Sequence, residues 1–367
     1  MLKIVIIGTK GIPNTYGGFE AFAQQISQRL AAIGYQVSVY QPHQSNKCLP
    51  PLNGVSRVPV KEYRFIPKNI GRIVYNFKSL TLACRQKPHV VICCGHSPAL
   101  FFPFFPKSFR KRIVVNMDGL EWRRTKWGFF GKTVLRITEW LAIKFTKNIV
   151  ADSKAIQQYI SDRYKKQSTY IAYGSETPTL ALKKTSLERF GIEPKNFGLV
   201  IARIEPENGI EQAIRAFSSL EKPLVIIGST DTYYAKMLLK KYSQNPHILF
   251  AGAIYDIELL CTLRHFCRVY FHGHSVGGTN PSLLDAMAAG CTIIAHNNPF
   301  NNETLGSGGL YFSDPESLNK AIQKLWYANP LSLERLANIN RNKIAKQYSW
   351  YGVTNRYREL IKTIAYA

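Results

Sequence analysis

Residues 274–290, HSVGGTNPSLLDAMAAG, join a glycine-containing loop to an apolar helix. Gly277 and Gly278 let backbone N–H groups approach a ligand without intervening side chains. Pro281 suits the first turn of a helix, and the free N–H groups of a helix start form a natural anion site. With Asp285 in the helix, the stretch predicts a pocket for a nucleotide diphosphate. The alternative is an ordinary strand-to-helix turn with Asp285 in solvent.

Short apolar runs that predict β-strands recur along the chain and alternate with amphipathic helices. The first, LKIVIIG, is followed by a glycine-rich loop and a predicted helix over 18–33. Strands that are apolar throughout and separated by helices favour parallel sheets buried on both faces. The pattern restarts after residue 176, which predicts an α/β fold of two consecutive doubly wound, Rossmann-like modules. Strands are expected at 2–8, 36–41, 89–95, 112–117, 148–153, 198–203, 224–229, 247–252, 269–273 and 292–296.

The predicted joint between the modules is the polar segment 171–180, IAYGSETPTL, which contains Gly and Pro. We therefore expect one domain at 1–175, a second at 176–345, and a final helical segment at 346–367. Ligands of such sheets bind beyond the carboxyl ends of the strands, so two facing modules predict a cleft between them.

The composition fits a folded chain of two domains, with 367 residues, 46% of them hydrophobic and 19% charged. No uninterrupted apolar run reaches the roughly 18 residues of a membrane-spanning helix. The start, MLKIVIIG, lacks the length and cleavage site of a signal peptide and is expected to be a strand. Seven scattered cysteines without C-x-x-C spacing fit a reduced, cytosolic protein better than a disulfide scaffold or a zinc site.

The net charge of +25 is unevenly distributed. Residues 1–175 contain 27 Lys and Arg against 7 Asp and Glu, whereas residues 176–367 contain 21 against 16. The first half is therefore expected to face a large anionic partner, either nucleic acid or an anionic membrane surface.

The loop GTKGIPNTYGGFEAFAQQI at 8–26 places Gly17 and Gly18 directly before a predicted helix. The G-x-G-x-x-G spacing of dinucleotide-binding loops is absent, and Gln41 stands where an acid would hold a ribose. Two adjacent glycines still indicate contact with a ligand, although tight packing of strand and helix is the alternative.

A second motif, ARIEPENGIEQAI at 202–214, places Arg203 at the end of a predicted strand. A guanidinium in this position can bind phosphate oxygens. Alternatively, Arg203 pairs on the surface with Glu205 or Glu207.

With these motifs the chain resembles retaining glycosyltransferases of the GT-B fold, in glycosyltransferase family four. The segments GTKGIPNTYGGFEAF, NMDGLEWRRTKW and ARIEPENGI resemble bacterial rhamnosyltransferases that assemble surface polysaccharides. The resemblance covers essentially the whole chain. It implies two Rossmann-like domains facing a central cleft, a C-terminal helix that crosses back to the first domain, and closure over the donor.

The resemblance also assigns donor-binding roles. Arg203 matches the arginine that binds the donor diphosphate, but the lysine usual five residues later is Asn208 here. The family's two glutamates, separated by seven residues, are replaced by Gly277 and Asp285. Asp285 would inherit the contact to the nucleotide ribose, and backbone groups would have to replace the side chain missing at Gly277. The predicted donor-binding residues are Gly17, Gly18, Arg203, Asn208, His274, Gly277, Gly278, Thr279, Asn280 and Asp285.

These departures from the family pattern agree with a 6-deoxy sugar as donor. The family's His-Gly, whose histidine lies near the sugar C6 hydroxyl, is Asp118-Gly119 here. A 6-deoxy sugar lacks that hydroxyl, and a shorter acid at Asp285 is compatible with a deoxyribose. The resulting hypothesis is dTDP-L-rhamnose. The alternatives are another donor, such as a UDP- or GDP-hexose, and a sugar-nucleotide epimerase of the same fold.

By resemblance the reaction retains the anomeric configuration, with the acceptor hydroxyl attacking from the face of the leaving group. The sequence contains no Asp-x-Asp, so neither a metal nor another cofactor is expected. Arg203 and helix N-termini would meet the charge of the leaving group. Asp118 is predicted to orient or deprotonate the acceptor, with Glu121 nearby. Capping of the following helix is the alternative role of Asp118.

Aromatic and cationic residues are interleaved at 61–78, 101–112 and 121–147. This composition suits peripheral attachment to an anionic membrane, here the inner face of the plasma membrane. The acceptor would be a saccharide linked to polyprenyl diphosphate. Much of 133–147 is expected to pack on the sheet instead, including Leu135, Trp140, Leu141 and Phe145. The residues predicted on the acceptor side are His96, Arg123 and Arg124.

A nucleic-acid-binding protein would use the same charge and aromatic residues. However, the sequence contains no zinc-finger, RNP or helix-turn-helix signature. Such a function would also leave the donor motifs unexplained, so nucleic acid is not expected as a partner.

Overall fold

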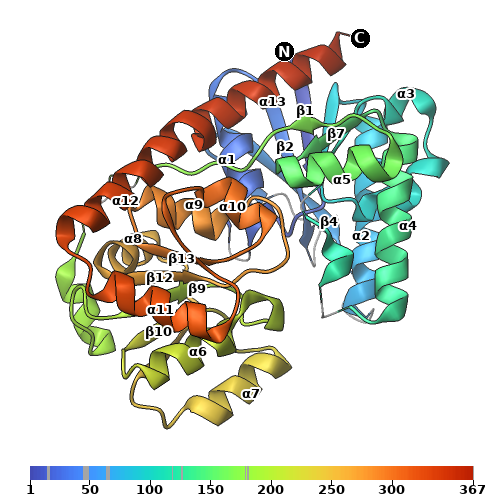
Figure 1. The fold of residues 1–367 in the computed structure, drawn as a ribbon. Coiled ribbons are helices and arrows are strands. Elements are labelled where there is room, and N and C mark those ends of the chain that lie inside the picture. The colour runs from blue at the N-terminus through green and yellow to red at the C-terminus, as the bar shows by residue number, and fades with distance from the viewer. Residues whose placement is uncertain are drawn as a thin grey trace. The chain divides into compact units, whose positions relative to one another are not determined.

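The computed structural model of the chain divides into two compact units. Unit 1 comprises Met1–Tyr173 and Trp350–Ala367, and unit 2 comprises Gly174–Ser349. Each unit is an α/β domain around a largely parallel sheet, which confirms the predicted fold class (Figure 1). The predicted boundaries at 175 and 345 lie two and four residues from these divisions. The structure describes residues 1–14, 17–43, 49–62, 67–117, 119–124, 127–177, 179 and 182–366.

The sheet of unit 1 has eight strands in the order β3-β4-β2-β1-β5-β6-β7-β8. All of its strand pairs are parallel except β3 with β4. The central strand β1 is buried from Ile4 to Ile7, as a strand covered by helices on both faces must be. The strands are β1 (Lys3–Ile7), β2 (Gln36–His43), β3 (Leu49–Leu52), β4 (Val55–Lys61), β5 (Val90–Cys94), β6 (Ile113–Met117), β7 (Asn148–Ala151) and β8 (Thr169–Tyr170).

The C-terminal helix α13 is an integral part of unit 1. Its buried residues recur every three or four positions and pack against α1. The ring of Phe22 on α1 lies 5.3 Å from that of Tyr357 on α13 and 5.6 Å from that of Tyr173. The helical segments of unit 1 are α1 (Gly18–Ala32), α2 (Lys68–Gln86), the 3-10 helix η1 (Ser97–Phe104), α3 (Lys107–Arg110), the 3-10 helix η2 (Glu121–Arg123), α4 (Phe129–Phe145), α5 (Lys154–Tyr164) and α13 (Trp350–Ala365).

The sheet of unit 2 has six strands, all parallel, in the order β11-β10-β9-β12-β13-β14. The strands are β9 (Gly198–Ile201), β10 (Leu224–Ile227), β11 (Ile248–Gly252), β12 (Val269–His272), β13 (Ile293–His296) and β14 (Gly309–Phe312). The helical segments are η3 (Lys184–Phe190), η4 (Pro206–Asn208), α6 (Ile210–Ser219), α7 (Tyr233–Tyr242), α8 (Ile257–Phe266), α9 (Pro281–Ala288), α10 (Pro299–Leu305), α11 (Pro315–Trp326), α12 (Pro330–Lys343) and the π-helix η5 (Ile344–Tyr348).

Helix starts in unit 2 follow a common local rule. In α9, α10, α11 and α12 the first residue is proline, whose missing N–H needs no partner there. The residue before each proline accepts a backbone N–H of the first turn through its side-chain oxygen. These caps are Asn280, Asn298, Asp314 and Asn329.

Four strands, β3, β4, β8 and β14, were not predicted from the sequence. Prolines in β3 and β4 obscure the apolar pattern. Proline is tolerated in β3 because it is the edge strand, and Pro59 of β4 lies beyond the residues that pair with β3. Among the helices in the described part of the chain, none combines the length and apolarity that crossing a membrane requires. The six cysteines that the structure describes are free, and all except Cys84 are buried.

Candidate functional site

The first candidate site lies at the carboxyl edge of the unit 2 sheet. Strands β9 and β12 are paired neighbours there, so the loops that follow them emerge side by side. The Ser282 hydroxyl, at the start of α9, donates a 2.8 Å hydrogen bond to the carbonyl of Ile201, the last residue of β9. Arg203 and the turn 277–280 therefore lie at the same edge of this sheet, as a shared diphosphate site requires.

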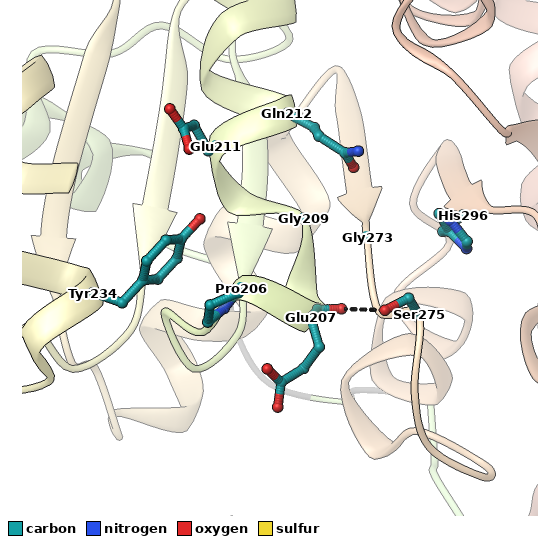
Figure 2. A pocket seen from close by; sticks show the side chains of 9 residues that line it. All are labelled: Pro206, Glu207, Gly209, Glu211, Gln212, Tyr234, Gly273, Ser275 and His296. Atoms are coloured by element: carbon teal, nitrogen blue, oxygen red, sulfur yellow. Dashed lines mark hydrogen bonds between the residues drawn. The ribbon is translucent and has the colours of Figure 1, made fainter. Parts of the chain in front are cut away.

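The loops after β9 and β12 are bound to each other directly. The carbonyl of Glu207 accepts hydrogen bonds from the amide and the hydroxyl of Ser275, at 2.9 and 3.0 Å (Figure 2). A Cβ on Gly273 would lie 2.4 Å from the carbonyl oxygen of Asn208, and Gly209 has a φ of +66°. Glycine is needed at both positions for the two loops to meet in this way.

A pocket of about 340 Å³ opens between these loops (Figure 2). Its walls come from the loops after β9, β12 and β13 and from the first turns of α6 and α7. The sequence analysis assigned none of these residues to a ligand, although His296 and Ser275 stand at or just beyond strand ends, where ligands of parallel sheets bind. The lining residues are Pro206, Glu207, Gly209, Glu211, Gln212, Tyr234, Gly273, Ser275 and His296.

Arg203 makes the surface pair with Glu205 that the sequence offers as its alternative role. Its guanidinium lies 3.6 Å from the Glu205 carboxylate, and the side chain is 40% exposed. A pair this long at the surface leaves donors available for a phosphate. Asn208 is buried, and its amide nitrogen donates a 2.7 Å hydrogen bond to the Arg203 carbonyl. The residue that replaces the family's lysine therefore fixes the main chain from which Arg203 extends.

Asp285 on α9 is oriented by two protein groups. One carboxylate oxygen accepts a 2.8 Å hydrogen bond from the Ser175 hydroxyl, and the other lies 3.3 Å from the Arg264 guanidinium of α8. The Arg264 side chain is 9% exposed, whereas that of Asp285 is 44% exposed. The carboxylate is thus fixed on one side and accessible on the other, as a ligand-binding acid should be.

The turn before α9 is shaped by capping and leaves space beside it. Asn280 accepts the amide of Ser282 at 2.9 Å, so its oxygen caps the helix. Thr279 and Gly278 are buried. A Cβ on Gly277 would meet no atom within 4 Å. The space next to the Gly277 backbone is therefore open, although the φ of Gly277, +156°, is one that residues with side chains rarely adopt.

His274 is held between two strand ends. Its ring stacks on His272 with centroids 4.3 Å apart and an angle of 12° between the planes. Its carbonyl accepts hydrogen bonds from the side chains of Asn298 and Asn301, at 2.9 and 3.0 Å. Burial, and secondarily the nearby His296, lower the pKa of His272 to about 3, so this ring is neutral near pH 7.

The glycines of the first loop lie at the start of α1 in unit 1. Gly17 is the N-terminal cap of this helix and Gly18 its first residue. A Cβ on Gly17 would come no closer than 3.6 Å to its nearest described neighbour, an oxygen of Glu20. The described part of unit 1 does not itself require glycine at this position, which agrees with a ligand that approaches the backbone there.

Two side chains that the sequence analysis did not assign to a role hold this loop in place. The buried carboxylate of Glu20 accepts the amide of Lys10 at 2.8 Å, and the Gln41 amide oxygen accepts that of Ile12 at 3.3 Å. A Cβ on Gly11 would lie 2.4 Å from the Gln41 Cβ, so glycine is required there by packing. Gln41 therefore has a structural role in the loop.

His96 follows β5 at the carboxyl edge of the unit 1 sheet and is buried. Its Nδ1 lies 2.9 Å from the Thr138 hydroxyl, which donates to the Leu135 carbonyl at 3.0 Å. The hydroxyl must therefore accept from the imidazole, which places the proton of the neutral ring on Nδ1 and leaves Nε2 as an acceptor. Burial lowers the pKa of His96, which favours this neutral form.

The remaining predicted residues of unit 1 lie in the segment around η2. The Glu121 carboxylate accepts from Arg124 at 2.5 Å and from the Trp127 indole at 3.4 Å. Arg123 is exposed and lies over the Trp122 ring at 5.3 Å. Asp118, the predicted acceptor base, lies outside the described residues.

A buried carboxylate missed by the sequence analysis anchors this segment. Glu139 on α4 accepts hydrogen bonds from the Trp122 indole at 3.2 Å, from Tyr159 at 2.7 Å and from Tyr164 at 2.5 Å. Burial, followed by the bond to Glu139, raises the pKa of Tyr159. Within the described residues, no three His, Cys, Asp or Glu side chains form a group that could hold a metal ion.

Solved structures identify the class of this architecture. Sucrose-phosphate synthase from Thermosynechococcus elongatus superimposes with a TM-score of 0.83 at 15% identity, covering 99% of both chains. HepE from Anabaena in complex with UDP-glucose gives 0.78 at 14% identity, covering 99% of this chain and 100% of that one. WaaG, a glycosyltransferase involved in lipopolysaccharide biosynthesis, gives 0.72 at 15% identity, covering 98% and 99%. The chain thus has the GT-B fold.

Two protein families match the chain, one in each half. Residues 183–343 match Glycosyl transferases group 1, and residues 1–176 match a Domain of unknown function (DUF1972). No curated protein matches the chain. Unit 2 therefore contains a glycosyltransferase group 1 domain, and the fold and this domain together support a GT-B glycosyltransferase.

Proposed function

We propose that the protein transfers L-rhamnose from dTDP-L-rhamnose to a saccharide linked to polyprenyl diphosphate, with retention of the anomeric configuration. The observation that carries the proposal is that the start of α9, the helix that bears Asp285, is bonded to the end of β9, the strand that leads into Arg203. The match to Glycosyl transferases group 1 and the similarity to HepE bound to UDP-glucose support a nucleotide-sugar donor.

The donor diphosphate would lie between Arg203 and the N-terminus of α9. The half-exposed guanidinium would supply charge-assisted hydrogen bonds, and backbone N–H groups of the glycine-containing turn before the helix would supply further donors, since those of the first helical turn already bond to Asn280. Both are fixed before the reaction, because Asn208 holds the Arg203 main chain and Asn280 caps the helix. Such preorganised donors stabilise the charge that develops on the leaving group.

The choice of donor rests on Asp285 and Gly277. Ser175 and Arg264 use two of the roughly four acceptor sites of the Asp285 carboxylate, so the side chain can still accept from a hydroxyl of the nucleoside sugar, and its short length is compatible with a deoxyribose. The open space beside Gly277 supplies no side chain for a donor sugar hydroxyl. Both features agree with thymidine diphosphate carrying a deoxy sugar.

In the proposed reaction, the acceptor hydroxyl oxygen forms a bond to the anomeric carbon on the face of the departing diphosphate. The bond between that carbon and the diphosphate oxygen breaks, and the diphosphate leaves with the bonding electrons. A diphosphate oxygen takes the hydroxyl proton, so no protein nucleophile is needed. We propose that Asp118 orients the acceptor, and that the reaction proceeds without a metal. Full turnover of Asp118→Asn, or loss of activity in EDTA restored by Mg²⁺, would contradict these two points.

The donor is tested by turnover of the purified protein with dTDP-rhamnose, UDP-glucose and GDP-mannose, each with a lipid-diphosphate-linked saccharide. We expect transfer from dTDP-rhamnose alone, with the anomeric coupling of the product matching that of the donor. Transfer from UDP-glucose and none from dTDP-rhamnose would overturn the donor assignment. Release of an epimerised sugar nucleotide without any acceptor would overturn the transferase assignment.

The lipid-linked acceptor is supported by the basic, aromatic character of unit 1 and by the similarity to WaaG, described as involved in lipopolysaccharide biosynthesis. Such a reaction would take place at the cytoplasmic face of the plasma membrane. Replacing the lipid by a short soluble alkyl chain should raise the acceptor KM. An unchanged KM would argue for a soluble acceptor.

A further inference from the structure

Three elements of unit 1, α2, η1 and α4, expose large apolar side chains. Nine such side chains on these elements are between 43% and 84% exposed. Clusters of exposed apolar side chains usually mark interaction sites. We call these nine residues the apolar surface: Ile70, Ile73, Phe77, Phe104, Phe129, Phe130, Val134, Ile137 and Trp140.

Helix α4 has apolar side chains on two opposite faces. Its inner face buries Leu135, Ala142 and Ile143 against the rest of unit 1. Its outer face carries Phe130, Val134, Ile137 and Trp140, spaced by three and four residues, so they form one stripe. The expectation that Trp140 packs on the sheet is wrong, since its side chain is 46% exposed.

The segment η1 lies beside both α2 and α4, because it contacts both helices. The ring of Phe77 on α2 lies 5.1 Å from that of Phe101 in η1 and 6.4 Å from that of Phe105. Phe104, in the same segment, is 77% exposed. The three elements that bear the apolar surface are therefore neighbours in the fold although they are far apart in the sequence.

The segments that bear the apolar surface contain many lysines and arginines and very few aspartates and glutamates. Helix α2 contains four Lys and Arg and no Asp or Glu, and residues 97–147 contain eleven against three. Of these three acids, Glu139 is buried and Glu121 is paired with Arg124. On α4 itself, the Lys144 ammonium lies 4.4 Å from the centre of the exposed Trp140 ring. This combination complements a surface that is apolar inside and anionic outside.

We propose that the apolar surface binds an anionic lipid bilayer, with the outer face of α4 in the headgroup region. Aromatic rings sit well at that depth, and lysine and arginine side chains reach from it to lipid phosphates. Since the partner of this surface is the membrane itself, the proposal does not require a particular donor. Only its connection to a lipid-linked acceptor rests on the proposed function.

The test is flotation of the full-length protein with phosphatidylcholine vesicles, with and without one third phosphatidylglycerol. We expect binding to the anionic vesicles only. Phe129→Ser/Phe130→Ser leaves the net charge unchanged, so any loss reports apolar contact rather than the basicity of the chain. Each phenylalanine should contribute about tenfold to the partition coefficient. Arg136→Gln/Lys144→Gln should lower it by about fivefold per charge.

A matched control is Tyr233→Ser/Leu331→Ser, which changes two equally exposed apolar side chains, 88% and 84% exposed, on unit 2. It should bind vesicles like the unchanged protein.

Fluorescence of Trp140, isolated by comparison with Trp140→Phe, should be quenched by brominated lipids. Equal binding by the phenylalanine variant and the unchanged protein would overturn the proposal. The proposal would also be overturned if the unchanged protein did not bind vesicles but formed a dimer that the phenylalanine variant dissociates. Neither readout uses donor or acceptor, so their failure is separate from failure of the proposed activity.

Discussion

Removal of Asp285 should destabilise unit 2 far more than removal of its partner Arg264. The two side chains are 3.3 Å apart, but Arg264 is 9% exposed and Asp285 44%. Asp285→Ala leaves a buried guanidinium without its anion, a loss of about 3–5 kcal/mol for a fully buried pair. Solvent already screens the exposed aspartate, so we expect about 2 kcal/mol. Arg264→Met removes the buried charge and leaves a carboxylate that water can solvate, so we expect less than about 1 kcal/mol.

The same substitutions should rank in the same order for nucleotide binding, for a different reason. In Asp285→Ala the proposed contact to the nucleoside sugar is lost. A hydrogen bond to a charged group contributes about 1.5–3 kcal/mol, so the Kd for dTDP should rise roughly 10- to 150-fold. In Arg264→Met the carboxylate remains and Ser175 still holds one of its oxygens. The Kd should then rise by less than about fivefold.

Urea unfolding and calorimetric titration with dTDP on the single variants and the double variant check both parts. The double variant should recover most of the stability lost in Asp285→Ala, because it no longer contains a buried, unpaired guanidinium. It should not recover the affinity. Equal losses of stability in Asp285→Ala and Arg264→Met would refute the asymmetry. An unchanged Kd in Asp285→Ala would refute the role of Asp285 in the donor site.

Three further predictions follow from the described side chains. Arg203→Ala should lower kcat/KM about 100-fold. Arg203→Lys should lower it by less, since lysine keeps the positive charge but loses the two parallel N–H donors of the guanidinium. The control is Arg215→Ala, which removes an arginine that is 67% exposed, and an equal loss of kcat/KM in this variant would contradict the prediction. Hydrogen bonds from Lys241 and Arg215 lower the pKa of Glu211 from 4.5 to about 2, so its stabilisation is present above pH 4.5 and lost as the pH falls toward 2. Glu211→Gln should therefore lower the free energy of unfolding by about 1–2 kcal/mol at pH 7 and hardly at all near pH 2, by urea titration. Burial lowers the pKa of His272 from its ordinary 6.5 to about 3. At a pH between these two values the unfolded chain binds a proton at this residue and the folded chain does not. The free energy of unfolding therefore falls as the pH drops through this range. His272→Phe should gain about 2 kcal/mol relative to the unchanged protein between pH 7.5 and pH 5, and a pH-independent difference would show that the ring binds a proton as readily in the folded as in the unfolded chain.

Much of the fold could be predicted because its central strands are apolar on both faces, a local property of the sequence. Strands β1, β5 and β6 illustrate this, since each is a buried run next to a glycine or a polar loop. Edge strands lack that pattern. The sequence of β3 is LPPL, and its pairing with β4 depends on the turn between them rather than on alternation.

The donor site was predictable only in part, for a similar reason. The positions of Arg203 and of the turn before α9 follow from strand ends and helix starts, which a sequence shows directly. The partners of Asp285 do not, because Ser175 lies 110 residues away and Arg264 lies on another helix. The sequence suggested a missing cation at Asn208. In the structure the side-chain amide of Asn208 donates to the Arg203 carbonyl, a role that no local sequence pattern predicts.

Helix α4 shows where periodicity fails and charge could have helped. With Leu135 and Ala142 on one side and Phe130, Val134 and Ile137 on the other, its apolar residues surround most of the helix, so spacing alone cannot say which face is buried. A helix apolar all round belongs inside a large core or at a membrane. The cations distinguish these cases, because Arg136 and Lys144 are exposed beside the outer stripe, whereas the inner face carries only the carboxylate of Glu139, fully hydrogen-bonded. A core position would have forced those cations out of water, so the outer stripe is not a core face, and the lipid headgroup layer proposed above would meet each cation with a phosphate.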